Sequence, residues 1–321
     1  MKLKLRTISL LFAAAVSCSA QAVDLSTAPL RLIVPFPAGG TADLLPRIIA
    51  EKIRPHFPQG VIVDNRPGAG GNIGADLVAK AKPNGLTLLA SPPGPIAINR
   101  SLYPSLSYEP NDFVPVTVLA EVPNVLAVSS SIPVKTVQEF IAYLKANPDK
   151  VSVASQGNGS TSHLTSEMFQ SLTNTKMIHV PYRGTAPAIA DLLGGHVGAF
   201  FDNITSSMPL HRAGKIRILA IADKKRSAAL PDIPTFSEAG LQNMYAVTWF
   251  GVVAPHGTPP DVVRKLNQII VEALKLPDVR SSFSDRGANI VGNTPEQMKE
   301  LVREDSARWA KVIQVGKITV D

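Results

Sequence analysis

The stretch that most constrains the fold is residues 32–43, LIVPFPAGGTAD. Its apolar start, residues 32–34, predicts a short buried strand, and the prolines that follow predict where this strand ends. A pair of glycines then predicts a flexible turn, and residues 41–43 predict the start of a helix that runs to about Ile53. A helix N-terminus presents free backbone N–H groups and the positive end of the helix dipole. We therefore expect this turn to bind a carboxylate or another small anion.

The same order of strand, glycine-rich or polar loop and helix recurs along the chain. Further strands are expected at residues 61–64, 86–90, 151–154, 177–180, 197–201 and 216–222. Strands separated by helices predict mostly parallel sheets covered by helices on both faces. The expected fold class is therefore α/β.

The length of 321 residues suggests about two domains. An extended run at residues 113–128, interrupted at Pro123 and Asn124, predicts a crossover from one domain to the other. Residues 249–254 are expected to return the chain to the first domain. The predicted domain 1 comprises residues 23–123 and 226–321, and domain 2 comprises residues 124–225.

Residues 1–22 have the pattern of a secretory signal peptide, with three basic residues, an apolar stretch and a small-x-small cleavage site. A lipoprotein signal around Cys18 is a weaker alternative, because Ala15 stands where a larger aliphatic residue is usual. Removing the three cations lowers the formal net charge from +7 to +4. The remaining Lys and Arg residues are scattered, which does not fit a nucleic-acid-binding surface. We expect an exported, periplasmic protein.

Three loops carry the donors that a ligand would need: residues 37–41, 68–72 and 155–162. In open α/β sheets, ligands bind outside the carboxyl ends of the strands. For any single glycine loop, a plain turn is the commoner explanation. Residues 155–162 hold more side-chain donors than a turn needs, which favours ligand binding.

Several single residues leave two interpretations open. Asp202 follows a buried strand, where it could cap a helix or contact a ligand equally well. Arg66 and Arg183 could hold a carboxylate as a fork, but a surface role fits Arg66 better. A structural role also fits His163 better than a ligand-binding role.

Patterns for catalysis and cofactor binding are weak. Residues 68–74, GAGGNIG, resemble a dinucleotide-binding loop, but the third glycine is one place late. No Gly-Lys-Ser/Thr sequence follows a glycine loop, and the six histidines lack metal-ligand spacing. Ser160 and His163 could form a dyad, although no third orienting group is evident. We expect a protein that is not an enzyme and that needs no cofactor or metal.

Seven stretches together are similar to the Bug-type extracytoplasmic solute receptors, the binding components of tripartite tricarboxylate transport systems. The resemblance runs over essentially the whole mature chain, and the matching stretches are 35–43, 63–76, 98–108, 180–197, 200–203, 219–240 and 249–259. The resemblance implies a two-domain periplasmic binding protein fold, type II-like, with two crossover segments. It also implies a carboxylate ligand held by hinge closure between residues 36–41 and 155–161, with Asp202 at the far end of the ligand.

The resemblance and the loops give one set of expected ligand-binding residues. They are Phe36, Pro37, Ala38, Gly39, Gly40, Thr41, Asp43, Gly70, Gly71, Ser91, Ser155, Asn158, Gly159, Ser160, Thr161, His163, Tyr182 and Asp202. The expected partners are a small carboxylate and the permease subunits of a tripartite tricarboxylate transporter, and the protein is expected to be a monomer. Two rival functions are a sensory receptor that docks on a signalling partner and a periplasmic hydrolase.

One loop departs from the family pattern. Where relatives carry polar side chains, residues 91–96 read SPPGPI, so that Pro95 and Ile96 replace two polar residues. If this loop lines the cleft, one side of the pocket is stiffer and more apolar. We therefore expect a ligand with an aromatic or apolar portion beside its carboxylate.

Overall fold

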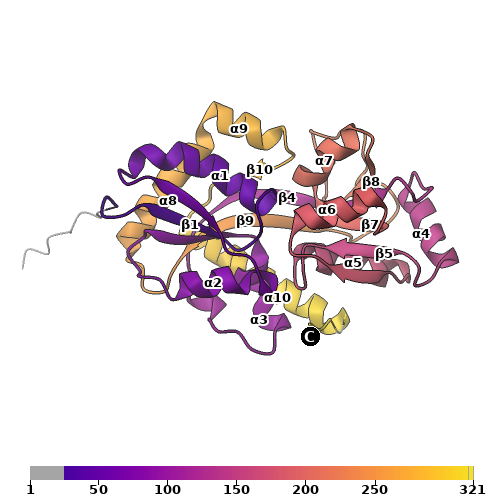
Figure 1. Ribbon diagram of the computed structural model, residues 1–321, viewed down its shortest axis with the longest axis horizontal. Coiled ribbons are helices and arrows are strands. Elements are labelled where there is room, and N and C mark those ends of the chain that lie inside the picture. Colours follow the sequence, from indigo (N-terminus) through magenta and orange to yellow (C-terminus); the bar gives the residue numbers. More distant parts are fainter. Residues whose placement is uncertain (1–24, 317, 321) are drawn as a thin grey trace, which may run out of the picture.

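The computed structural model describes residues 25–316 and 318–320 (Figure 1). The predicted signal peptide lies outside these residues. Among the helices of the described part, none is both long and apolar enough to cross a membrane.

Ten strands of the described chain form one mixed sheet, in which the order β2-β1-β3-β9-β4-β7-β5-β6 is continuous and β8 and β10 pair with β4. The strands are β1 (Leu30–Val34), β2 (Val61–Asn65), β3 (Thr87–Ser91), β4 (Val114–Ser129), β5 (Ser152–Ser155), β6 (Ile178–Pro181), β7 (Ala199–Asn203), β8 (Ile216–Ile221), β9 (Val247–Ala254) and β10 (Asn289–Ile290).

The sheet has a first half, with β1, β2, β3 and β9, and a second half, with β5, β6 and β7, and helices flank both halves (Figure 1). They are α1 (Thr41–Ile53), α2 (Asn72–Ala79), α3 (Asn99–Leu102), α4 (Val137–Ala146), α5 (Thr161–Thr173), α6 (Thr185–Gly194), α7 (Ile204–Arg212), α8 (Pro260–Lys275), α9 (Pro277–Ser284) and α10 (Pro295–Gly316). In Figure 1, α1, α2, α8 and α9 lie around the left half and α4 to α7 around the right half. The α/β fold class expected from the sequence is confirmed.

The long strand β4 connects the two halves. Its first part, Val114–Pro123, pairs with β9, and its second part, Asn124–Ser129, pairs with β7 and β8. The sequence suggested an interruption at Pro123 and Asn124, but the strand continues through both residues. Pro123 lies at the point where β4 changes partners. The domain boundary at this point stays a prediction.

The direction of the strands differs between the outside and the centre of the sheet. The pairs β1–β2, β1–β3, β5–β6 and β5–β7 are parallel, as strand–helix alternation predicts. In contrast, β4 and β9 are antiparallel to each other and to their other neighbours. These two strands run in opposite directions because one carries the chain into the second half and the other carries it back.

The C-terminal helix α10 also contacts both halves. Trp309 and Ile313 of α10 pack against Leu102 from the first half and Leu164 of α5 from the second half. Trp249 of β9 donates its indole N–H to the buried Asp305 of α10 at 2.9 Å. This packing gives the two halves a common support on one side.

Candidate ligand-binding cavity

A cavity lies between the two halves, at the carboxyl ends of strands from both. Its volume is only about 20 Å³, which is enough for about one water molecule. Its walls are formed by Phe36, Pro37, Gly40, Ala42, Pro92, Gln156, Gly184, Thr185, Asn203 and Phe250. A ligand with several non-hydrogen atoms therefore needs the walls to move apart before it can enter.

Three helices begin at this cavity. The N-cap residues of α1, α6 and α7 are Gly40, Gly184 and Asn203, and all three line the cavity. Within the described residues, none of these N-termini has a side-chain cap. The free backbone N–H groups and the positive dipole ends therefore favour an anion between them. Lys and Arg are absent from the described residues that form the walls.

A polar network braces the turn before α1. Asp43 accepts hydrogen bonds from the Gly39 backbone N–H at 3.1 Å and from Arg47 Nε at 2.9 Å. Asn65 donates to the Phe36 carbonyl and to Asp43, both at 2.9 Å. Burial alone would raise the pKa of Asp43, but the hydrogen bonds from Arg47 and Asn65 outweigh it and hold the pKa below its usual value. The structure therefore places Asp43 as a support of the turn.

Asp202 lies behind the opposite wall. It is fully buried, and its oxygens accept from Ser207 Oγ at 2.8 Å and from Gln156 Nε2 at 2.9 Å. Burial raises the pKa of Asp202 to about 7, although these hydrogen bonds act in the opposite direction. Asp202 does not itself line the cavity, whereas Gln156 does. Any influence of Asp202 on a ligand in this arrangement passes through Gln156.

The walls touch each other across the cavity. Thr41 Oγ1 at the start of α1 lies 3.0 Å from Ser206 Oγ of α7. A Cβ atom added to Gly40 would lie 3.0 Å from Thr185 Oγ1, and one added to Gly184 would lie 2.9 Å from the Pro37 ring. Glycine at these two positions therefore allows the two halves to approach closely.

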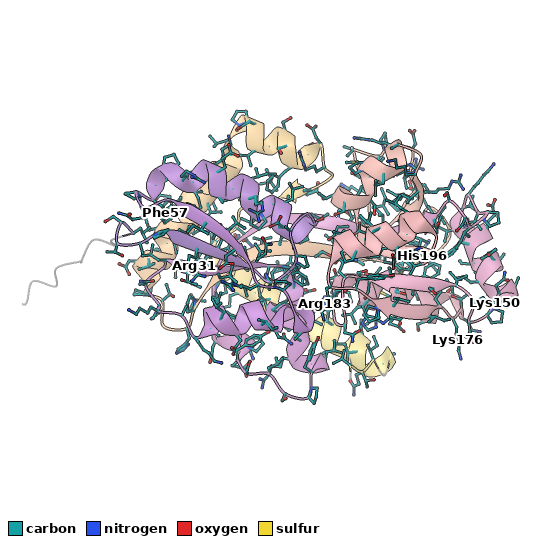
Figure 2. All side chains as sticks on the ribbon, in the orientation of Figure 1. Arg31, Phe57, Lys150, Lys176, Arg183 and His196 are labelled. Carbon is teal, nitrogen blue, oxygen red and sulfur yellow. The ribbon has the colours of Figure 1, made fainter. Side chains whose placement is uncertain are left out.

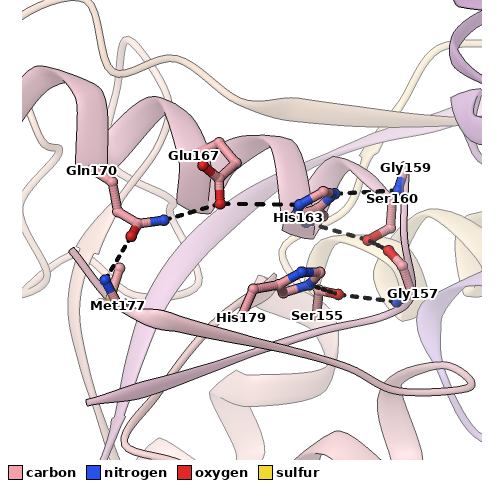
Figure 3. A network of polar contacts seen from close by, with 9 residues as sticks. All are labelled: Ser155, Gly157, Gly159, Ser160, His163, Glu167, Gln170, Met177 and His179. Atoms are coloured by element: carbon pink, nitrogen blue, oxygen red, sulfur yellow. Dashed lines mark hydrogen bonds and ion pairs between the residues drawn. The ribbon is translucent and has the colours of Figure 1, made fainter. Parts of the chain in front are cut away.

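The loop at residues 155–162 rests on two stacked histidines (Figure 3). Ser155 Oγ lies 2.6 Å from His179 Nε2, and the Gly159 N–H donates to His163 Nδ1 at 3.3 Å. The two imidazole rings are stacked with centroids 4.0 Å apart. Burial lowers the pKa of His163 to about 3 and that of His179 to about 4. Both rings are therefore neutral at pH 7, and they support the loop through their hydrogen bonds with Ser155 and Gly159.

Ser160 and His163 are neighbours but do not form a dyad through the imidazole. Ser160 Oγ accepts from the His163 backbone N–H at 3.2 Å and donates to the Gly157 carbonyl at 2.7 Å. This is the geometry of a helix N-cap at the start of α5. The uncapped helix ends at the cavity are thus α1, α6 and α7, and α5 is capped by its own side chain.

The predicted ligand-binding residues occupy several environments. Phe36, Pro37 and Gly40 line the cavity, and Ala38 and Gly39 form the exposed tip of the same turn. Thr161 bonds Thr248 at 2.7 Å. As ligand contacts, all of these residues stay predictions.

Other predicted residues lie at contacts beside the cavity. The Tyr103 hydroxyl lies 3.5 Å from the Asn158 carbonyl, and a Cβ on Gly70 would lie 3.0 Å from that carbonyl oxygen. Gly71 approaches Pro95 and the Phe36 ring, and a Cβ on Gly159 would meet Leu102. Gly70 and Gly159 therefore allow loops of the two halves to pack together, whereas the contacts of Gly71 lie within the first half.

Two further predicted residues form hydrogen bonds with residues of their own half. Ser91 donates to the Pro92 carbonyl at 2.9 Å. The Tyr182 hydroxyl donates to Asp191 of α6 at 2.5 Å. Arg183, labelled near the middle of Figure 2, is exposed and is not part of the cavity wall.

The loop that departs from the family pattern contributes Pro92 to the cavity. Ile96 is only 2 % exposed and packs in the core with Ile33 and Val118. Pro95 is also buried and lies against Gly71. The apolar side of the cavity therefore comes from Pro92, Phe36 and Phe250, and the two residues singled out in the sequence do not line it.

The cavity also holds residues outside the predicted set, namely Ala42, Pro92, Gln156, Gly184, Thr185, Asn203 and Phe250. Gly184 and Thr185 could have been found from the Gly-Thr pair at the start of the α6 helix, and Asn203 from its place at the end of a buried strand. Their convergence with Gly40 depends on contacts between distant parts of the chain, which local patterns do not contain.

Comparisons with known proteins agree with this arrangement. Residues 45–318 match the family described as "Tripartite tricarboxylate transporter family receptor". Protein BugT of Bordetella pertussis is 39% identical over 288 residues, which cover 89% of this chain and 88% of BugT.

Three solved structures are similar over nearly their whole length. Rpa4515 of R. palustris with adipate has a TM-score of 0.89 at 39% identity and covers 92% of this chain and 99% of its own. The periplasmic binding protein BugD has a TM-score of 0.87 at 34% identity, and the match covers 91% of this chain and 99% of BugD. MatC from Rhodopseudomonas palustris with bound malate has a TM-score of 0.85 at 34% identity, and the match covers 89% of this chain and 99% of MatC.

Proposed function

The chain belongs to the tripartite tricarboxylate transporter receptor family, and from this premise we propose that it captures a small organic carboxylate between its two halves and delivers it to a membrane transporter. Members of this family are periplasmic carboxylate-binding receptors. The ligand of this chain, its closure and its membrane partner form the proposal.

One observation carries the proposal: three uncapped helix N-termini, at Gly40, Gly184 and Asn203, meet at a cavity whose described walls lack basic side chains. Each helix end acts as a partial positive charge of roughly half a unit, and an anion at such an end gains about 0.3–1 kcal/mol. Because the three ends come from both halves, a carboxylate between them favours the closed arrangement.

The proposed mechanism is hinge closure. In an open form, the α1 end on one half and the α6 and α7 ends on the other are exposed to water. A carboxylate that binds all three shifts the population toward the closed form, because it has a higher affinity for that form. The closed surface is then available to a membrane partner.

The relatives indicate which ligands to test first. The Rpa4515 structure contains adipate and the MatC structure contains malate. Native mass spectrometry of the purified protein would detect a co-purified ligand, and a carboxylate panel would follow on the ligand-stripped protein. We expect at least one small carboxylate to raise the thermal unfolding temperature, because a ligand that binds only the folded state stabilises it. A panel without any stabilising carboxylate would contradict the proposal.

Two rival functions are separated by direct assays. A sensory receptor would bind the same ligand but would pull down a signalling protein instead of permease subunits. A hydrolase would convert the ligand, so that recovery of unchanged ligand after incubation supports a binding protein. The capping geometry of Ser160 favours the binding function.

A further inference from the structure

The side chain of Gln156 has a fixed orientation at the edge of the cavity. Its nitrogen Nε2 lies 2.9 Å from Asp202 Oδ1 and 3.1 Å from Thr185 Oγ1. An amide nitrogen has two hydrogens, so both are used by these acceptors. The remaining polar atom of the side chain is the carbonyl oxygen Oε1.

Asp202 determines this orientation. Both oxygens of Asp202 accept hydrogen bonds in this structure, Oδ1 from Gln156 Nε2 and Oδ2 from Ser207 Oγ at 2.8 Å. Turning the Gln156 amide over would place its carbonyl oxygen against the buried carboxylate, which is strongly unfavourable in a low-dielectric interior. Asp202 is therefore a positioning residue for Gln156.

The carbonyl oxygen of Gln156 is available to a ligand. Gln156 lines the cavity, and its Oε1 has no hydrogen-bond donor among the described residues. Several fully buried polar atoms of the described residues lack a hydrogen-bond partner, and Gln156 Oε1 is not one of them. Because Oε1 has no donor either, it is accessible to solvent. Asn203 adds no second free acceptor, because its Oδ1 lies 3.4 Å from Gln156 Nε2 and its nitrogen donates to Asn124 Oδ1 at 2.8 Å.

The cavity thus combines backbone donors with one amide acceptor, Gln156 Oε1. The donors at the helix ends suit a carboxylate, but a carboxylate cannot satisfy Gln156 Oε1 because it has no hydrogen to donate. An ammonium group could donate, yet it would place a positive charge among three positive helix ends. A hydroxyl group donates without a charge and fits both requirements.

We propose that the ligand of this protein carries a hydroxyl group in addition to its carboxylate, and that Gln156, oriented by Asp202, accepts the hydrogen bond from this hydroxyl. The inference rests on the carboxylate-binding function proposed above and narrows its ligand class to hydroxycarboxylates. The apolar wall of Phe36, Pro92 and Phe250 leaves room for a carbon skeleton beside these polar groups.

Matched pairs of ligands test the inference on the unmodified protein. Isothermal titration calorimetry would compare malate with succinate and mandelate with phenylacetate, which differ only by the hydroxyl. We expect the hydroxylated member of a binding pair to bind at least about tenfold more tightly, since a bound ligand covers Gln156 Oε1 and leaves it unpaired when the hydroxyl is missing.

The outcomes distinguish the two proposals. Equal affinity within each pair would overturn the hydroxyl inference and leave carboxylate binding intact. Tighter binding of aspartate than of malate would also overturn it, because the acceptor would then serve an ammonium group. The failure of every carboxylate to bind would overturn both proposals.

Variants of Gln156 and Asp202 add a second test. In Gln156→Leu, the preference for the hydroxylated member should fall to about twofold or less, because the acceptor is gone. In Asp202→Asn, the Gln156 amide can turn over, so the preference should fall while the protein still binds carboxylates. Gln268→Leu on the exposed face of α8 is the matched control and should keep the full preference. An unchanged preference in Gln156→Leu would overturn the inference.

Discussion

Thr41 and Ser206 form a hydrogen bond between the two halves of the molecule, with their hydroxyl oxygens 3.0 Å apart. Thr41 is the first residue of α1 and Ser206 lies in the first turn of α7. The contact therefore links two of the helix N-termini that face the cavity, one from each half of the molecule. A hydrogen bond of this kind contributes to the closed arrangement and must break when the halves separate.

Ser206→Ala should weaken ligand binding by up to about tenfold. The net contribution of a hydrogen bond is about 0.5–1.5 kcal/mol, and this one would be lost only in the closed form. The equilibrium would shift toward the open form, and the apparent affinity would fall with the population of the closed form. Calorimetry measures the affinity, and small-angle X-ray scattering measures the compactness of the unliganded protein.

Ser237→Ala is the control for this prediction, because the Ser237 hydroxyl bonds Gln242 within one exposed segment of the second half. Its affinity should match that of the unmodified protein. If Ser206→Ala binds the ligand as tightly as this control does, the contact does not contribute to closure.

Gly184→Ala should impair both stability and binding. Gly184 has φ +104°, and an added Cβ would lie 2.9 Å from the Pro37 ring on the opposite half. The backbone strain costs about 1–3 kcal/mol, and the steric contact prevents the walls from closing. We expect a lower thermal unfolding temperature and at least about tenfold weaker binding.

Gly214→Ala separates these two effects. Gly214 has φ +68° and nothing within 4 Å of an added Cβ, so this variant carries the strain without the contact. It should lose stability but bind ligand normally. Equal loss of affinity in both variants would show that strain alone explains the result.

Local sequence patterns were sufficient to predict the strand and helix that form the first-half side of the cavity. The predicted strand and helix of residues 30–53 agree with β1 and α1, because prolines, glycines and apolar periodicity act within a few residues. The family resemblance placed Phe36, Pro37 and Gly40 together, and these three residues do line the cavity. As ligand contacts they await the binding experiments.

The second wall depends on contacts between distant residues. Asp202 was recognisable as a carboxylate after a buried strand, but its link to Gln156 spans 46 positions and follows from the packing of β7 beside β5. The stacking of His163 on His179 likewise joins a helix to a strand. No local pattern indicates whether such a side chain faces a cavity or supports its wall.

The stacked histidines should make the protein less stable in acid. The pKa of His179 is lowered to about 4 and that of His163 to about 3, whereas both are near 6.5 in an unfolded chain. Between pH 6.5 and 4 the unfolded state binds more protons than the folded state, so the free energy of unfolding falls as the pH falls. Urea unfolding at pH 7.5, 6, 5 and 4.5 measures this dependence.

His179→Asn should reduce the loss of stability between pH 6.5 and 4, although the protein will be less stable at pH 7.5 because the hydrogen bond with Ser155 is removed. The exposed His256→Asn is the control and should keep the full pH dependence. Asp202 contributes equally to all three proteins and cancels in the comparison. Identical slopes for His179→Asn and His256→Asn would contradict the interpretation of the pair.

Ligand binding should depend only weakly on salt concentration. The described walls of the cavity lack Lys and Arg, and the anion is expected to be held by backbone N–H groups at the starts of α1, α6 and α7. Salt screens exposed charges over a Debye length of about 10 Å at 0.1 M, but it acts much less on short contacts inside a closed cavity. Between 50 mM and 500 mM NaCl, we expect the dissociation constant to change by about threefold or less.

A steep decrease in affinity over this range would mean that exposed cations, such as Arg183 beside Gly184, hold the ligand instead of the helix ends. Repeating the titration with Arg183→Gln would then identify the cation, and an unchanged affinity for this variant at low salt agrees with the helix-end site.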